Sequence, residues 1–198
     1  MTQHHSTRLT SRFCHDMANP LGAIGNGLEL LSMSGLPPSP ELALIEESLT
    51  QAKATLQRFR FAFGNATDGD ADAQHMAKFQ KVFRDSAPRI DLSTPDLNIN
   101  ALQAKLYCLI AMCLENSLPV GGMIDVSKSG DGVLFKATGR LVKFDPDLWT
   151  AISAPDQADA EIPPARLHFV IAGMTVQDLG GSVTVQADDD MIEVSVQA

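Results

Sequence analysis

Two runs of apolar residues at helical spacing, one on each side of a short loop, dominate the first third of the chain. The first run comprises Leu9, Phe13, Met17, Leu21, Ile24, Leu28 and Leu31. The second comprises Leu42, Ile45, Leu49, Ala52, Leu56, Phe59 and Phe63. Steps of three and four lay an apolar stripe along one side of an α-helix. Because the loop contains Gly35, three prolines and the capping residue Ser39, we predict two antiparallel helices.

Two amphipathic helices cannot cover both of their own apolar stripes. The smallest arrangement that does so joins the hairpin to a second copy in a four-helix bundle, so we predict a homodimer. The alternative is a hairpin folded back on the rest of its own chain. We place this helical-hairpin dimerisation domain at residues 1–64, with a polar, frayed start through about Ser6 and a first helix that ends near Ser34.

The rest of the chain predicts a second domain of mixed type. Residues 65–73 are small, polar and unpatterned, which indicates a linker. Between residues 74 and 198 we expect helices at 76–85, from a cap at Asn98 or Asn100 to 117, and after Pro163 and Pro164. This last helix should bury Leu167, Val170, Ile171 and Met174. Strands are expected at 90–92, 123–128, 133–138, 182–186 and 191–196. The predicted fold class is α+β, a helical hairpin followed by a two-layer α/β sandwich with helices on one face of a mixed sheet.

Composition excludes several classes of function. The 198 residues carry a formal charge of −9, which argues against nucleic acid because phosphate binding requires clustered Lys and Arg. No apolar run approaches ~18 residues and no signal core precedes the first helix, so we expect no membrane association and a cytoplasmic location. Cys14, Cys108 and Cys113 lack the spacing of a disulfide framework or a zinc site. We expect them to be buried packing residues.

His15 stands apart from the apolar stripe of the first helix. It lies about 200° around the helix from Met17. Its own row runs along the other side of the helix and comprises Arg8, Arg12, His15, Asn19, Gly22 and Asn26. Pro20 follows five positions later and should bend the helix, because it lacks an N–H and crowds the carbonyl of Asp16. An exposed imidazole beside an acid and a bend is a candidate reactive group.

The segment around His15 resembles a known motif. His15-Asp16-x-x-x-Pro20 is similar to the phosphoacceptor box of two-component histidine kinases. The longer stretch, from Arg12 to Leu31, more closely resembles ChpT-type histidine phosphotransferases, which have the same His-Asp pair, proline and Asn-Gly-Leu-Glu-Leu-Leu continuation. The resemblance implies that His15 is the phosphoacceptor and that Asp16 orients the imidazole or tunes its basicity.

Small and basic residues near His15 predict a surface for a partner. In this interpretation Ala18, Asn19, Gly22, Ala23 and Asn26 form a shallow landing surface, since a partner backbone must come close. Counting from the loop, Arg58 should lie level with His15. Arg8, Arg12 and Arg58 would then make a local positive area that attracts an acidic partner or a phosphoryl group.

The second domain resembles the ATP-binding domain of histidine kinases. Residues 114–124 are similar to the end of that family's helix with the magnesium-binding asparagine and to the Pro-x-Gly-Gly strand entry after it, and residues 179–183 to its final turn. The glycine motifs that receive adenine and cradle phosphates are absent from 139–148 and 161–166. We therefore expect no ATP site, no metal or cofactor of the protein's own, and Glu115 and Asn116 as polar residues at a helix end.

Together these features predict a phosphorelay protein. His15 would carry a phosphoryl group between the receiver domain of a hybrid histidine kinase and the receiver domains of response regulators, and the receiver would supply Mg²⁺. One alternative is a divergent histidine kinase that labels itself from ATP. The other is a dimeric scaffold that binds response regulators and is never phosphorylated.

Overall fold

The computed structural model describes residues 3–35, 37–64, 73–157 and 162–197. The chain divides into two compact units, Met1–Asn65 and Ala66–Ala198. Of the predicted linker, residues 65–72 lie outside the described residues, and Ala73 already belongs to the next helix. Of the predicted frayed start, Met1 and Thr2 also lie outside, whereas the helix begins at Gln3, earlier than expected.

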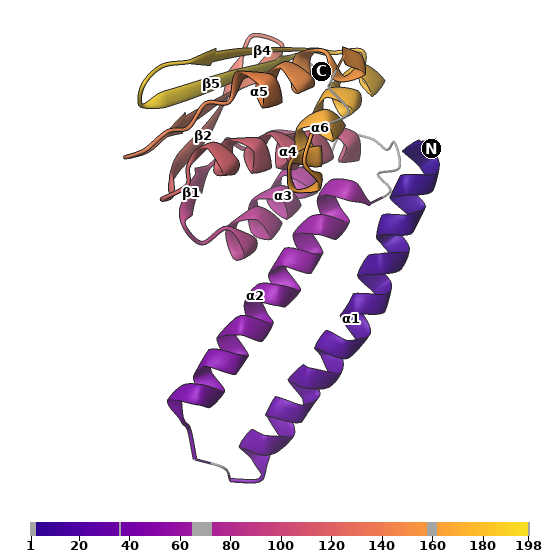
Figure 1. Cartoon of the computed structure of the whole chain (residues 1–198), viewed down its shortest axis with the longest axis vertical. Helices are drawn as coiled ribbons and strands as arrows, with labels where there is room; N and C mark the ends of the chain where they lie inside the picture. Colours follow the sequence, from indigo (N-terminus) through magenta and orange to yellow (C-terminus); the bar gives the residue numbers. More distant parts are fainter. Residues whose placement is uncertain (1–2, 36, 65–72, 158–161, 198) are drawn as a thin grey trace. The chain divides into compact units, whose positions relative to one another are not determined.

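The first unit is an antiparallel helical hairpin (Figure 1) of α1 (Gln3–Met33) and α2 (Pro40–Phe63). Helix α1 continues through Pro20. Ser39 caps α2, and its side chain accepts a hydrogen bond from the backbone N–H of Leu42 at 3.3 Å. Pro40 then occupies the first helical turn, where its missing N–H costs nothing. The loop chemistry therefore produces the predicted reversal of chain direction.

The second unit is an α/β domain. Its helices are α3 (Ala73–Ser86), α4 (Ala101–Ser117), α5 (Pro146–Ser153) and α6 (Leu167–Asp178), with short 3-10 turns η1 (Pro155–Gln157) and η2 (Pro164–Arg166). Its strands are β1 (Ile90–Ser93), β2 (Gly122–Ser129), β3 (Gly132–Thr138), β4 (Ser182–Ala187) and β5 (Met191–Gln197). Each strand predicted from the sequence is present, and the fold is of the predicted α+β class.

The five strands form one mixed sheet in the order β1-β2-β3-β5-β4. Strands β1 and β2 are parallel and the other neighbours antiparallel. Alternate residues of β2, β3 and β5 are buried, so one face of the sheet is covered. Tyr107 of α4 meets Phe135 of β3 edge-on, with ring centroids 5.5 Å apart. The outer face is polar, and Lys136 pairs with Glu193 across neighbouring strands at 3.4 Å.

Local chemistry fixes the start of α4 and the entry to β2. Asn100 begins α4 with a capping box, in which its side chain and that of Gln103 bond each other's backbone N–H. Gly121 has a φ of +87° just before β2, and a Cβ there would lie 2.5 Å from the carbonyl oxygen of Arg89. Only glycine fits this close approach between the strand entry and β1.

Two features of the second unit differ from the prediction. Helix α5 was not expected, although Asp145-Pro146 is an N-cap followed by proline at the first helical position. The predicted inward face of α6 is wrong in part, because Leu167 and Met174 are 46% and 37% exposed. The buried side of α6 instead comprises His168, Phe169, Ala172, Gly173, Thr175 and Val176.

The packing of α5 explains why the buried side of α6 was predicted incorrectly. Helix α6 packs against both α4 and α5, so two neighbours decide which residues are covered. A Cβ at Gly173 would lie 2.6 Å from the carbonyl oxygen of Ile152 in α5. Trp149 of α5 meets Phe169 of α6 edge-on at 5.3 Å. Small residues are buried on α6 because α5 approaches its backbone closely.

Candidate active site

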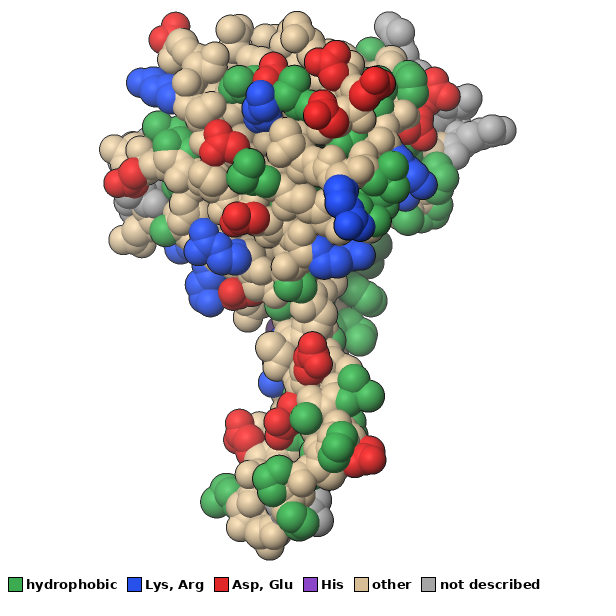
Figure 2. All heavy atoms as spheres, turned by 90° about the vertical axis from the view of Figure 1, so that its left-hand side faces the viewer, with side chains coloured by type: hydrophobic (Ala, Val, Ile, Leu, Met, Phe, Trp, Pro, Cys, Tyr) green, Lys and Arg blue, Asp and Glu red, His purple; other side chains and the backbone are tan. Residues whose placement is uncertain are grey.

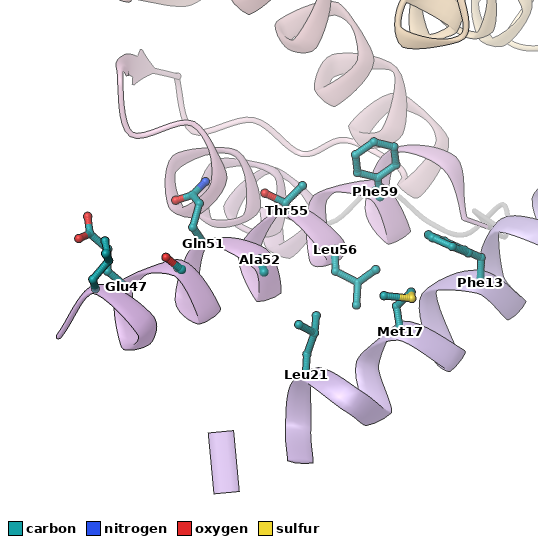
Figure 3. A pocket seen from close by; sticks show the side chains of 11 residues that line it. Phe13, Met17, Leu21, Glu47, Gln51, Ala52, Thr55, Leu56 and Phe59 are labelled. Atoms are coloured by element: carbon teal, nitrogen blue, oxygen red, sulfur yellow. The ribbon is translucent and has the colours of Figure 1, made fainter. Parts of the chain in front are cut away.

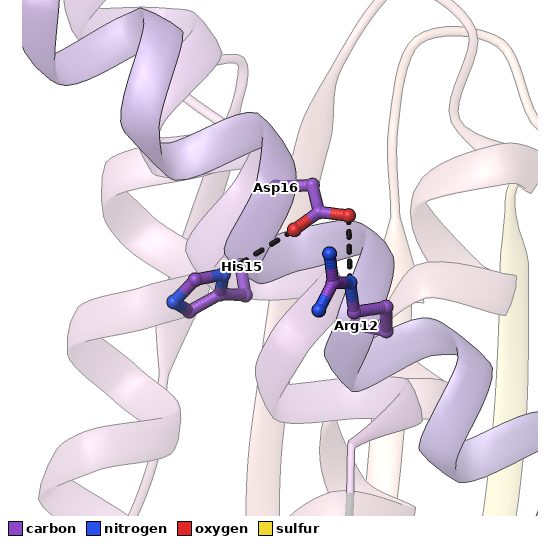
Figure 4. A network of polar contacts seen from close by, with 3 residues as sticks. All are labelled: Arg12, His15 and Asp16. Carbon is purple, nitrogen blue, oxygen red and sulfur yellow. Dashed lines mark hydrogen bonds and ion pairs between the residues drawn. The ribbon is translucent and has the colours of Figure 1, made fainter.

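His15 lies on the solvent-exposed side of α1. Its side chain is 72% exposed, while the preceding residue, Cys14, is 3% exposed. Two successive residues so different in burial show that α1 turns Cys14 inward and the imidazole outward, as the helical spacing predicts. The prediction that Cys14, Cys108 and Cys113 are buried is confirmed. In Figure 4 the imidazole ring projects away from the axis of α1.

Asp16 lies between His15 and Arg12 (Figure 4). Its Oδ1 is 3.3 Å from Nδ1 of His15, and its Oδ2 accepts a hydrogen bond from Nε of Arg12 at 2.8 Å. Arg12 first, and His15 second, lower the pKa of the Asp16 carboxyl group. Asp16 is therefore held as a carboxylate beside the ring. In the tautomer with hydrogen on Nδ1, this carboxylate accepts the N–H, and the lone pair lies on Nε2.

The predicted landing residues follow His15 along α1. Ala18, Asn19, Ala23 and Asn26 are exposed, and Gly22 is half-buried. A Cβ added to Gly22 would meet nothing within 4 Å. The small side chain at Gly22 is thus not required by packing inside this chain. This landing surface is shallow and exposed, as a surface that binds a partner must be.

The basic residues near His15 differ in their surroundings. Arg8 is exposed on α1, and Arg12 is engaged by Asp16. Arg58 is half-buried, and its Nε atom is buried. Arg60 of α2 is the arginine whose charge acts on the Cys14 thiol, where it lowers the pKa that burial raises. Arg60, which the sequence analysis did not single out, therefore adds to the positive charge near this part of α1.

A groove opens on the other side of the hairpin (Figure 3). Its walls are mostly apolar residues of both helices, namely Phe13, Met17, Leu21, Leu44, Glu47, Ser48, Gln51, Ala52, Thr55, Leu56 and Phe59. Phe13 is 59% exposed, Leu44 63% and Phe59 43%. Phe13 and Phe59 belong to the stripes that the sequence predicted to need a cover, whereas Leu44 was not among them. The groove and His15 therefore belong to opposite sides of α1.

The other histidines and polar residues that the sequence singled out are buried or half-buried in helices of the second unit. His168 is 9% exposed and lies 4.8 Å from the Phe169 ring, while His75 is half-buried on α3. Glu115 and Asn116 are half-buried at the end of α4. Within the described ranges, no three His, Cys, Asp or Glu side chains gather as a metal site would require. In the same ranges no helix is long and apolar enough to span a bilayer.

Comparisons with known proteins agree with this geometry. A family model described as histidine phosphotransferase C-terminal domain matches residues 71–191. The protein phosphotransferase ChpT of Brucella abortus (strain 2308) is 32% identical over 96% of this chain and 93% of its own. A structure titled as a bacterial phosphotransferase has a TM-score of 0.65 and 25% identity over 94% of this chain and 92% of its own.

A more distant structure shows the fold alone. Full-length ShkA in complex with AMPPNP has a TM-score of 0.51 at 14% identity, over 96% of this chain and 45% of its own. The family model covers more than half of the chain, and the Brucella relative matches nearly all of it. The chain belongs to the histidine phosphotransferase family and is a phosphotransferase of two-component phosphorelays.

Proposed function

We propose that His15 carries the phosphoryl group between receiver-domain aspartates and that the protein does this without ATP. The observation that supports the proposal is an imidazole 72% exposed whose Nδ1 is held by a carboxylate. This arrangement leaves Nε2 facing solvent with its lone pair. A reactive group that must meet large partners one after another has to lie in the open, and His15 does.

The residues support a direct displacement. The Nε2 lone pair of His15 attacks the phosphorus of an aspartyl phosphate, and the P–O bond to the aspartate breaks. The aspartate leaves as a carboxylate with the bonding electrons. The ring becomes a cation that keeps its proton on Nδ1, and the Asp16 carboxylate stabilises that charge. A second receiver's carboxylate then attacks the same phosphorus and Nε2 leaves as neutral imidazole. Mg²⁺ bound by the receiver offsets the phosphoryl charge.

The absence of ATP chemistry is part of the proposal. Residues 139–148 follow β3, where the kinases have a glycine motif, and here they lead into α5. Phe144 stacks on Trp149 with ring centroids 6.1 Å apart and 13° between the planes, and Trp149 packs on Phe169. Aromatic side chains of this segment and of α5 thus pack toward α6. This packing favours a shuttle over a divergent kinase.

The working unit is, in this proposal, a homodimer in the cytoplasm. The apolar groove of each hairpin would receive the other hairpin, which gives a four-helix bundle with one His15 per subunit on the outside. The receiver domains of a hybrid histidine kinase and of response regulators would approach from the His15 side. Because groove and imidazole lie on opposite sides of α1, dimerisation and phosphotransfer do not compete.

Labelled receiver domains test the proposal. Mixed with a ³²P-phosphorylated receiver, wild type should take up label, while His15→Gln should take up none and His75→Gln should behave as wild type. Asp16→Asn should still be labelled, but at a rate lowered by roughly 10²-fold, because an orienting and charge-stabilising partner is lost.

Three results would contradict this assignment. Label on the His15→Gln variant would place the phosphoacceptor elsewhere. Uptake of label from ATP and Mg²⁺ by wild type alone would make the protein a kinase, and equal inertness of wild type and His15→Gln toward every receiver would favour the scaffold.

A further inference from the structure

Charge is unevenly distributed along the hairpin. Residues 1–64 contain five cations and five acids, so the net charge of −9 belongs to the rest of the chain. All five cations lie in the half of the hairpin away from the loop, namely Arg8, Arg12, Lys53, Arg58 and Arg60. The loop half contains four glutamates and no cation, namely Glu29, Glu41, Glu46 and Glu47. Asp16 is the one acid among the cations.

Two of the α2 cations reach toward the face of α1 that meets α2, and helical spacing puts them on the side away from the groove, as it does His15. A Cβ at Gly25 of α1 would lie 2.7 Å from Nζ of Lys53. The charge of Arg60 acts on Cys14, which immediately precedes His15. The spacing of seven residues places Lys53 and Arg60 on one side of α2. Neither residue contributes to the apolar groove, whose α2 residues occupy the other side of the helix.

Glutamates occupy the far end of the same side. Glu46 is seven residues before Lys53, so the two lie on the same side of α2. Glu29 is fourteen residues after His15, so these two lie on the same side of α1. Both are exposed. Because Lys53 lies against Gly25, an antiparallel count places Glu29 and Glu46 at nearly the same level. A rise of 1.5 Å per residue puts that level about 21 Å from His15.

The members of this charged strip, defined as Arg8, Lys53, Arg60, Glu29 and Glu46, are open to a partner. Across the described ranges no ion pair involves any of the five, and all are exposed. Arg12 is excluded because Asp16 engages it. In Figure 2 acidic side chains gather on the loop half of the hairpin. The strip therefore presents positive charge beside His15 and negative charge at its far end.

We propose that the charged strip selects and orients its partner by a matching charge distribution. The partner that fits is a receiver domain with its acidic acceptor site over His15 and a basic patch about 20 Å away, over Glu29 and Glu46. A compact domain of about 100 residues has a radius of gyration near 13 Å, so it spans the strip. Receivers with acidic side chains at that second place are repelled. This selection rests on the phosphotransfer function proposed above.

Reversing the far end of the strip tests the selection. The experiment measures kcat/KM for transfer from a phosphorylated receiver domain that loads wild-type His15. Glu29→Lys/Glu46→Lys should lower kcat/KM about tenfold near 50 mM salt, and near 500 mM salt most of this loss should vanish, because salt screens exposed charges. Arg60→Glu should lower it similarly. Receiver variants whose patch is changed from Lys or Arg to Glu should recover the rate with Glu29→Lys/Glu46→Lys.

The matched control is Asp188→Lys/Asp189→Lys, which makes the same change of net charge in an exposed turn of the second unit. It should change kcat/KM less than twofold. If Glu29→Lys/Glu46→Lys leaves the rate unchanged, raises it, or lowers it no more than the control does, the selection is refuted. If no phosphorylated receiver loads wild-type His15 at all, it is the proposed function that fails.

Discussion

Gly22 has no packing reason within this chain to be glycine. A Cβ there would extend into open space, and glycine inside a helix is less favourable than alanine by about 1 kcal/mol. The absent side chain instead leaves room beside His15, two turns along α1. Because Gly22 also lies on the row of His15, we explain this glycine by the approach of a partner backbone.

Stability and transfer should therefore respond in opposite directions to Gly22→Ala. The free energy of unfolding should rise by about 1 kcal/mol, measured by chemical denaturation at fixed protein concentration. Transfer from a phosphorylated receiver should slow severalfold. Gly27→Ala, also with no atom within 4 Å of its Cβ, should raise stability equally and leave the rate unchanged. A faster or unaltered transfer in Gly22→Ala would remove Gly22 from the docking surface.

At the scale of elements, α4 is the helix around which the second domain is packed. Most of its residues are buried, and α3 and α6 pack on either side of it. Burial raises the pKa of Tyr107, at the middle of α4, to about 12. The ring packs edge-on against Phe135 of the sheet, so ionisation would place a charge between the two layers.

The Tyr107 shift predicts a dependence of stability on alkaline pH. An unfolded tyrosine ionises near pH 10, so the unfolded state loses this proton first as the pH rises. The stability due to neutral Tyr107 is complete below about pH 10 and is lost as the pH approaches 12. Between pH 10 and 11, wild type should lose about 1 kcal/mol relative to Tyr107→Phe in denaturation experiments. Parallel profiles for the two proteins would show that Tyr107 is not buried as described.

Elements also show where prediction from sequence failed. Helix α5 has a clear start at Asp145-Pro146, but its eight residues are too few for a periodic pattern to stand out. Because α5 was not predicted, the large apolar residues Leu167 and Met174 were assigned to the buried side of α6. The packing of α5 instead buries Gly173 and its small neighbours. One short helix that was missed thus turned a second helix to the wrong side.

At the scale of the whole molecule, the hairpin has an apolar face that its own two helices leave exposed. Four large side chains that are exposed on this unit line one groove, namely Phe13, Met17, Leu44 and Phe59. At about 25 cal/mol per Å², covering such a face contributes several kcal/mol of association free energy. The apolar face is the physical reason to expect a dimer.

Leu44→Lys tests the dimer because Leu44 lines the groove and is 63% exposed. In a monomer the change would have little effect on stability, whereas in a four-helix bundle it buries a charge. Light scattering should give twice the chain mass of 21.3 kDa for wild type and one chain mass for Leu44→Lys. Leu30→Lys, at a site 66% exposed and outside the groove lining, should remain dimeric. A monomeric wild type would contradict the bundle.

The sequence by itself determined the hairpin, the outward position of His15 and the positions of the strands along the chain. These features depend on helical or strand spacing and on turn residues, which act within one or two turns of the chain. Asp16 lies next to His15 in the chain, so its contact with the ring was also within reach of sequence. All of these are local relations.

Only the tertiary structure decided which side of a helix meets a neighbour. Three features depend on contacts between separate elements: the action of the Arg60 charge on Cys14, the buried side of α6 and the approach of Lys53 to Gly25. Packing between elements sets a helix's rotation to within a fraction of a turn, and a shift of two residues turns a side chain by about 200°. That rotation is what spacing along a single helix cannot specify.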